Sequence, residues 1–133
     1  MSPAFDLATK LQTLGFGTIA AESGVSIAVS TEPDAPDECI TVYDTGGAGP
    51  DTHEMDLLRP TIQVRVRART YAAGYARMRA IQIALIAILS ETLDTYKFIM
   101  VQPISDILAI GRDENDRFHL TSNYQLLLEV AAT

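Results

Sequence analysis

The sequence contains no tryptophan, and Cys39 is its only cysteine. A lone cysteine excludes an internal disulfide, and its place in the apolar run of residues 39–42 favours a buried thiol. Only two histidines are present, and neither belongs to a cysteine or carboxylate spacing typical of a zinc site. The longest apolar run, residues 83–89, is far shorter than the roughly 20 residues that span a bilayer. We therefore expect no disulfide, no metal site and no membrane span.

Basic residues are also scarce, with 10 of them against 17 acidic residues and a formal net charge of −7. A chain of this charge repels phosphates at a distance, which disfavours nucleic acid as a partner. The N-terminus has no basic segment followed by an apolar stretch, so we expect no secretory signal peptide. Apolar residues make up 47% of the 133 residues, which predicts a folded body and suits one domain spanning residues 1–133.

The charges are segregated along the chain. Residues 11–58 contain no lysine or arginine, whereas residues 59–79 contain six arginines and no acidic residue. Three of these arginines, Arg65, Arg67 and Arg69, alternate with apolar residues and form a row on one face of a predicted strand. One interpretation is that the charges pair within the monomer. The other is that the acidic segment of one copy meets the arginine row of the next, in a heterologous interface that closes into a ring.

Periodicity predicts two helices and several strands. Helices are expected at residues 3–14, where Ser2 and Pro3 suit the N-cap and first turn, and at residues 71–93. Strands are expected at residues 25–29, 39–43, 61–69, 98–102 and 118–130, with a charged hairpin tip at residues 111–117. The acidic, proline-bearing segment 32–38 is predicted to be a surface connection. The order predicts an α+β fold, in which an antiparallel or mixed β-sheet is packed by two helices on one face, with a β-hairpin at the C-terminus.

Two features of this pattern predict contact with a neighbouring molecule. Residues 44–59 show no sustained period, and a loop of that length in a compact domain is usually functional. The second half of the 71–93 helix has almost no polar face, because Ile83 and Ile86 add apolar surface on its flanks. A single sheet does not cover a helix on more than one side, so a partner is expected there.

Motifs that would carry chemistry are missing. The glycines at 46, 47 and 49 are not followed by the Lys-Ser/Thr of a phosphate loop. Asp113, Asn115 and Asp116 resemble the start of a calcium loop, but the required glycine and terminal glutamate are absent. No nucleophile stands in a recognisable catalytic context. Two other classes stay open: a small enzyme or ligand-binding α+β domain with residues 44–59 as a lid, and a nucleic-acid-binding module that uses the arginine row.

Several segments resemble a known family. The run 40–47 (Ile-Thr-Val-Tyr-Asp-Thr-Gly-Gly), a proline-bearing loop, the run 59–67 (Arg-Pro-Thr-Ile-Gln-Val-Arg-Val-Arg) and a tyrosine-led helix are similar to the tail terminator or minor capsid proteins of long-tailed, siphovirus-like bacteriophages. Residues 103–105 and 110–118 resemble the hairpin of the same family. The resemblance covers the chain from about Cys39 to its end.

This resemblance implies a structural virion protein that is not an enzyme and has no catalytic residue, cofactor or metal. Such proteins form a homo-oligomeric ring, typically a hexamer, that caps the head-proximal end of the tail tube, ends tube polymerisation and offers a docking surface for the head connector. The implied partners are further copies, the tail tube protein and a connector or head-completion protein, while genomic DNA passes through the ring without specific binding. The implied location is the virion tail at the head-tail junction, after assembly in the host cytoplasm. Another head-tail joining or tail-completion protein is the alternative.

Candidate interface residues come from the 44–59 segment and from the arginine row. They are Asp44, Gly46, Gly47, Asp51, Arg59, Arg65, Arg67 and Arg69.

Overall fold

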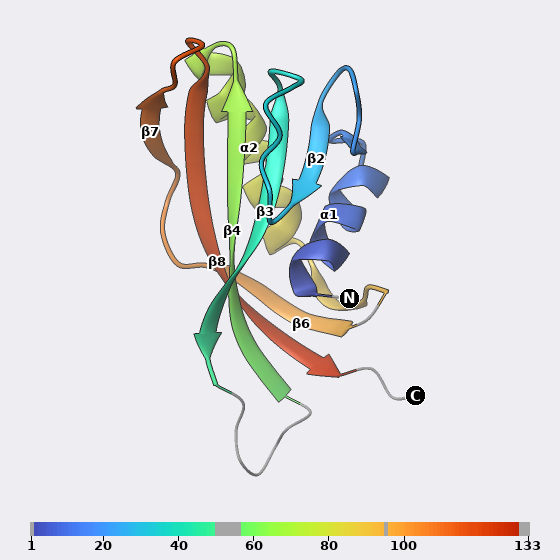
Figure 1. Cartoon of the computed structure of the whole chain (residues 1–133). Coiled ribbons are helices and arrows are strands. Elements are labelled where there is room, and N and C mark those ends of the chain that lie inside the picture. The colour runs from blue at the N-terminus through green and yellow to red at the C-terminus, as the bar shows by residue number, and fades with distance from the viewer. Residues whose placement is uncertain (1, 50–56, 95, 131–133) are drawn as a thin grey trace.

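The computed structural model describes residues 2–49, 57–94 and 96–130. Two helices, α1 (Pro3–Thr13) and α2 (Tyr71–Ile86), lie behind a curled β-sheet (Figure 1). The strands are β1 (Thr18–Ile19), β2 (Ser26–Val29), β3 (Cys39–Ala48), β4 (Leu57–Ala68), β5 (Leu89–Thr92), β6 (Tyr96–Pro103), β7 (Leu108–Arg112) and β8 (Phe118–Val130). The α+β fold predicted from the sequence is confirmed.

The sheet is mixed, and its strands follow the order β1-β2-β3-β4-β8-β6-β5. β1, β2 and β3 run parallel to one another, and the other neighbouring strands are antiparallel. β8 is the shared strand, because β4 lies along one side of it while β7 and β6 pair in turn with the first and second halves of the other side. β2 and β7 consequently lie at opposite ends of the upper part of the sheet (Figure 1).

Strand register explains why both helices cover the same face. On β4, Val66 pairs with Ile40 of β3 and with Leu120 of β8, so these three side chains point to one side of the sheet. All three are fully buried and belong to one apolar core. α1 contacts β2 and β3 over this face, and α2 contacts β4, β6 and β8. The residues that alternate with these core-facing residues along each strand, including those of the arginine row, therefore lie on the opposite face of the sheet.

The N-terminal helix forms for the local reasons that its sequence predicts. The Ser2 hydroxyl accepts a hydrogen bond from the Phe5 backbone N–H at 3.3 Å, and Pro3 occupies the first turn, where no N–H is needed. Ala4, Leu7, Ala8 and Leu11 recur on one stripe and are completely buried. The helix ends at Thr13, within one residue of its predicted end.

The second helix is shorter than predicted, because it ends at Ile86 rather than at residue 93. Residues 89–92 form strand β5 instead, in which Leu89 pairs with Met100 of β6. Leu89 is 71% exposed, and Tyr71 at the start of the helix is also exposed. Met78, Ile81 and Leu85 form the buried side of the helix.

The 44–59 segment is less irregular than predicted. β3 continues through Ala48, and β4 begins at Leu57, so much of the expected loop is a β-hairpin. Its backbone pairing passes through a register shift between Asp44 and Gly46 before Gly47 pairs with Pro60. The hairpin extends downward from the body of the sheet (Figure 1). Residues 50–56, including Asp51, lie outside the described residues.

Candidate assembly surfaces

The arginine row is largely used inside the chain. Arg67 is only 2% exposed, and its guanidinium donates to Glu32 Oε1 at 3.1 Å, to the Pro36 carbonyl at 2.7 Å and to the Asp37 carbonyl at 3.1 Å. All three acceptors belong to the acidic segment 32–38. The guanidinium thus folds that segment against β4, which matches the first of the two interpretations of the segregated charge.

The other two arginines of the row differ from Arg67 in exposure. Arg69 is exposed and forms an ion pair with Asp37 at 2.8 Å, and its backbone N–H donates to the Glu38 carboxylate. The hydrogen bond from the Arg69 side chain to the Asp37 carboxylate holds the pKa of Asp37 below its ordinary value. Arg65 is half-buried, and its guanidinium carbon lies 5.7 Å from the centre of the Tyr43 ring in a cation–π arrangement. These two side chains are the members of the row that the isolated chain leaves accessible.

A charged cluster that sequence patterns did not reveal joins the 32–38 segment to the β7–β8 turn. Arg117 is nearly buried, bonded to Asp113 at 2.9 Å and to the Asp34 carbonyl at 2.6 Å. His119 lies between two carboxylates, with Nε2 at 2.9 Å from Asp113 and Nδ1 at 3.6 Å from Glu32. The sequence indicated only a charged hairpin tip at residues 111–117. No local sequence spacing predicts this cluster, because the 32–38 segment and the β7–β8 turn are far apart in the sequence, with 83 residues between Asp34 and Arg117. The two segments meet only when β4 and β8 pair.

Asp113 is the most strongly held carboxylate of this cluster. The hydrogen bond to His119, together with those from Arg117 and from the backbone N–H of Asn115, holds the pKa of Asp113 far below its ordinary value. Asp113 is therefore ionised at neutral pH. It locks the β7–β8 turn to the sheet.

The β3–β4 hairpin carries the remaining candidate residues. Gly46 and Gly47 both have positive φ, at 89° and 94°, which lets the strand bulge past Thr61 and Pro60. Asp44 is exposed, and its Oδ1 accepts from the Ala4 N–H at 3.1 Å, so it ties the hairpin to the start of α1. Arg59 is exposed on β4 beside the bulge.

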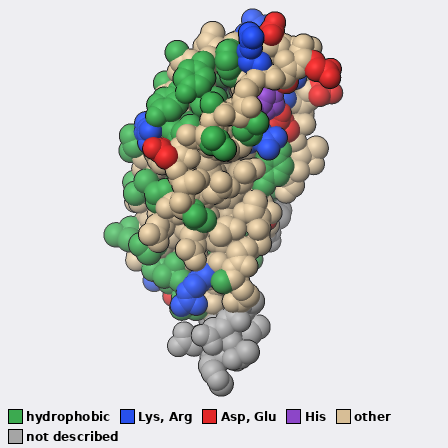
Figure 2. All heavy atoms as spheres, turned by 90° about the vertical axis from the view of Figure 1, so that its left-hand side faces the viewer, with side chains coloured by type: hydrophobic (Ala, Val, Ile, Leu, Met, Phe, Trp, Pro, Cys, Tyr) green, Lys and Arg blue, Asp and Glu red, His purple; other side chains and the backbone are tan. Residues whose placement is uncertain are grey.

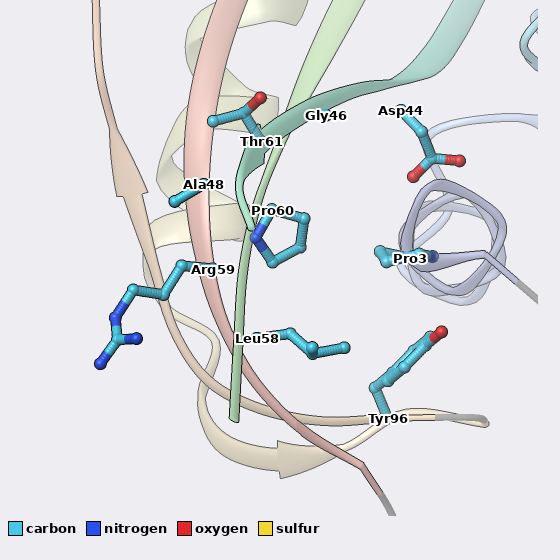
Figure 3. A pocket seen from close by; sticks show the side chains of 9 residues that line it. All are labelled: Pro3, Asp44, Gly46, Ala48, Leu58, Arg59, Pro60, Thr61 and Tyr96. Atoms are coloured by element: carbon cyan, nitrogen blue, oxygen red, sulfur yellow. The ribbon is translucent and has the colours of Figure 1, made fainter. Parts of the chain in front are cut away.

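A hollow of about 320 Å³ lies between the base of the hairpin, the start of α1 and the first residue of β6. In Figure 3 the side chains of Pro3, Asp44, Leu58 and Tyr96 face this space, whereas Arg59 points away from it. The Asp44 carboxylate is already bonded to the backbone of α1. The lining is mostly apolar, and it offers no convergent set of an acid, a base and a nucleophile of the kind that would support catalysis.

The structure also exposes large apolar side chains on the β7 side of the molecule. Figure 2 shows this face, with hydrophobic side chains gathered along its left and a few more near its centre. Large apolar side chains that are exposed include Ile83 and Ile86 of α2, Leu89 of β5, Met100 of β6, Ile104, and Leu108 and Ile110 of β7. Ile83 is 65% exposed and Leu108 is 63% exposed. By strand register, Leu108 lies beside Thr121 on the arginine face of the sheet, whereas α2 covers the other face, so these side chains form more than one apolar surface. The expectation of an uncovered apolar flank on α2 is confirmed.

Within the described residues, no group of three or more His, Cys, Asp or Glu side chains is arranged to hold a metal ion. In the same part of the chain, neither helix combines the length and the apolar character needed to cross a membrane.

Taken together, the curled mixed sheet, the two helices and the projecting hairpin make a small α+β chain that exposes several large apolar side chains. Residues 10–130 match the model of the bacteriophage tail terminator protein family, so the chain belongs to that family and is a structural protein of a phage-type tail. A chain from a structure titled "Virion of native gene transfer agent (GTA) particle" is similar in fold, with a TM-score of 0.60 and 13% sequence identity over 77% of this chain and 78% of that one. No curated protein matches the sequence.

Proposed function

We propose that this chain assembles into a hexameric ring that caps the head-proximal end of the tail tube. The ring would stop tube polymerisation and offer a docking surface to the head connector or head-completion protein. The observation that carries this proposal is the match of residues 10–130 to the tail terminator family. The single domain 1–133 would be the repeating unit, made in the host cytoplasm and retained at the head-tail junction of the virion.

Two structural features support an assembling subunit. Several large apolar side chains remain exposed, and burying such side chains against another protein is favourable. The β3–β4 hairpin extends away from the core, with residues 44–48 exposed, so it can reach a neighbouring molecule without disturbing the body. A rigid body with a projecting arm suits a subunit that must contact both like and unlike neighbours.

We propose that the projecting hairpin contacts the tail tube or the connector, through Asp44, Gly46, Gly47, Asp51 and Arg59. The accessible arginines Arg65 and Arg69 extend this surface along β4. Arg67 would act differently, by fixing the 32–38 segment that lies next to them, since its guanidinium is buried against that segment. We therefore leave Arg67 out of the interface that the sequence suggested.

Genomic DNA would pass through the ring without specific binding. Arg67, Arg69, Arg77 and Arg79 each have an acidic partner in the same chain, so their charges are largely neutralised before DNA arrives. The formal charge of −7 per copy repels phosphates further. Both facts disfavour the nucleic-acid-binding alternative.

Electron microscopy of particles produced without this chain tests the proposal. Tubes that are overlong or uncapped, and that lack heads, are the expected result. Detached tails of normal length would favour the alternative of a joining or tail-completion protein, and normal infectious particles would overturn both. An Arg59→Glu variant, compared with the charge reversal Glu114→Arg at an exposed position of the β7–β8 turn, then asks whether the hairpin is the contact. Only the first substitution should reproduce the phenotype of the missing chain.

A further inference from the structure

The opposite ends of the sheet carry surfaces that match one another. At one end, Leu108 and Ile110 of β7 are exposed, and so is Ile104 in the connection that precedes this strand. All five residues of β7 are exposed, and its only neighbour among the described strands is β8. The outer edge of β7 therefore presents unpaired backbone groups beside apolar side chains, a combination that favours pairing with a strand of another chain.

At the other end, an apolar groove of about 450 Å³ runs along β2. Its lining includes Phe5 of α1, Ile19 of β1, Ala28 and Val29 of β2, and Pro33 and Ala35 of the following segment. None of the residues that line it is charged. β1 covers β2 only at Ser26 and Ile27, so beyond Ile27 the edge of β2 is also open among the described strands.

From these two surfaces we propose that β7 and the apolar side chains around it dock into the β2 groove of a second copy of this chain. The inference rests on the proposed ring and says which surfaces build it. The occupant of the groove must be apolar and able to pair as a strand, and β7 satisfies both requirements. Its sequence, Leu-Ala-Ile-Gly-Arg, has four uncharged residues before its single arginine.

Electrostatics near the contact is consistent with a like partner. The charged groups next to β7 are paired within the chain, with Arg79 bonded to Asp106 at 3.1 Å and Arg112 next to Asp116 at 3.7 Å. Neither surface brings an isolated charge to the other. The two copies of this acidic chain consequently meet through apolar side chains and backbone groups, the parts of their surfaces where repulsion between like charges is weakest.

The geometry of this contact also makes it a ring-forming one. β2 and β7 lie at opposite ends of one sheet, so the surface that one copy offers differs from the surface that it accepts. A contact of this heterologous kind repeats from copy to copy, and it gives a closed ring when the rotation between copies closes and an open filament when it does not. The proposed ring requires the first case. The sheets of successive copies would then continue one another around the ring.

Cysteine cross-linking in assembled particles tests the contact. The double variant Ala28→Cys with Ile110→Cys places one thiol in the groove and one on β7, while Cys39 is buried and can stay in place. A short bifunctional thiol reagent should convert this variant into a ladder of covalent multiples whose largest member gives the number of copies in the ring. Each single variant is the matched control and should give no ladder.

Three other outcomes have distinct meanings. No ladder from the double variant, in tails of normal length with heads attached, would overturn the docking of β7 while leaving termination intact. Covalent dimers from Ile110→Cys alone would show that β7 meets β7, which also overturns it. If the double variant gives overlong headless tails and the chain on those tails still forms the ladder, the contact between copies exists without ending tube growth. That result would count against the proposed function and not against the docking of β7.

A charge placed on β7 gives an independent test. Ile110→Lys should prevent incorporation of the chain into tails, because the groove lined by Val29 and Ala28 offers the ammonium no partner. Val130→Lys, at another partly exposed apolar position at the end of β8, should be incorporated normally. Circular dichroism of both purified variants checks that each is folded. Equal incorporation of the two folded variants would contradict the proposal.

Discussion

At the scale of single residues, Arg67 has the clearest structural role, because it is the only basic side chain of the row that is buried. Replacing it by alanine would leave the half-buried Glu32 carboxylate and two backbone carbonyls without their donor. We expect Arg67→Ala to lower the free energy of unfolding by about 3 kcal/mol, as when one partner of a buried ion pair is lost. Urea denaturation of the two proteins measures this loss.

Arg69→Ala is the matched control for that experiment. Its side chain is 75% exposed, and its ion pair with Asp37 is open to water. Exposed pairs contribute at most about 1 kcal/mol, so the Arg69 variant should unfold close to the wild-type protein. If the two substitutions destabilise the chain equally, burial of the Arg67 guanidinium is not what makes it important.

The single thiol gives a second prediction at this scale. Cys39 is 1% exposed, its Sγ lies 3.5 Å from the Thr41 hydroxyl, and burial raises the pKa of the thiol above its ordinary value. Burial keeps reagents away from the thiol, and the raised pKa lowers the fraction of reactive thiolate. We expect a thiol-specific chromogenic reagent at pH 8 to react with Cys39 only after a denaturant unfolds the chain. A Ser105→Cys variant, exposed on the β6–β7 connection, should add one rapidly reacting thiol.

At the scale of elements, the two glycines of the hairpin test how tightly β3 and β4 approach one another. A Cβ on Gly47 would lie 2.7 Å from the Thr61 backbone nitrogen and 2.8 Å from the Arg59 carbonyl oxygen, whereas a Cβ on Gly46 would meet nothing within 4 Å. Both positions have positive φ, so alanine costs about 1 kcal/mol at either. Gly47→Ala should cost more, because the strands must also separate. A thermal melt of the two variants measures the difference, and equal melting temperatures would contradict the close approach.

The hairpin also shows why part of the fold could not be predicted from the sequence. Strand prediction relies on alternation between a buried and an exposed face, and residues 61–68 of β4 alternate because one face is core. From Asp44 onward β3 has left the core, and both of its faces are exposed. No alternation is then required, so the sequence there looks like a loop even though its backbone is paired.

The end of α2 was mispredicted for a different reason. Residues 87–89 are Ala, Ile and Leu, whose helix propensities allow the helix to continue. The chain nevertheless leaves the helix after Ile86, and β5 begins at Leu89 because that segment pairs with β6. Ser90, inside β5, has a φ of 48°. Tertiary pairing thus overrides helix propensity. The apolar flank of α2 was predictable, since Ile83 and Ile86 are visible in the sequence whatever covers them.

At the scale of the whole molecule, ionised carboxylates join its separate segments, and their lowered pKa values predict acid sensitivity. Hydrogen bonds from cationic side chains or from the backbone hold the pKa of Asp37, Asp106 and Asp113 below that of a free aspartate. A group whose pKa is lower in the folded chain stabilises the fold above its unfolded pKa, and this contribution is lost as the pH falls. We expect stability to decline from about pH 5 towards about pH 2. Asp113→Asn should be less stable at neutral pH and should lose less on acidification, which denaturation at a series of pH values measures.

The use of charge within the monomer makes a last prediction about assembly. If the acidic segment of one copy met the arginines of the next, added salt would weaken the ring, because about 1 M salt shortens the screening length to roughly 3 Å. In the folded chain, Glu32, Asp37 and Glu38 already have arginine partners of their own. Copies that meet through apolar surfaces, and that each carry a charge of −7, should instead associate at least as well when salt screens their repulsion. Sedimentation of cross-linker-free, detached tail ends at 0.1 M and 1 M salt distinguishes the two cases, since release of this chain at high salt would mean that ion pairs between copies hold the ring together.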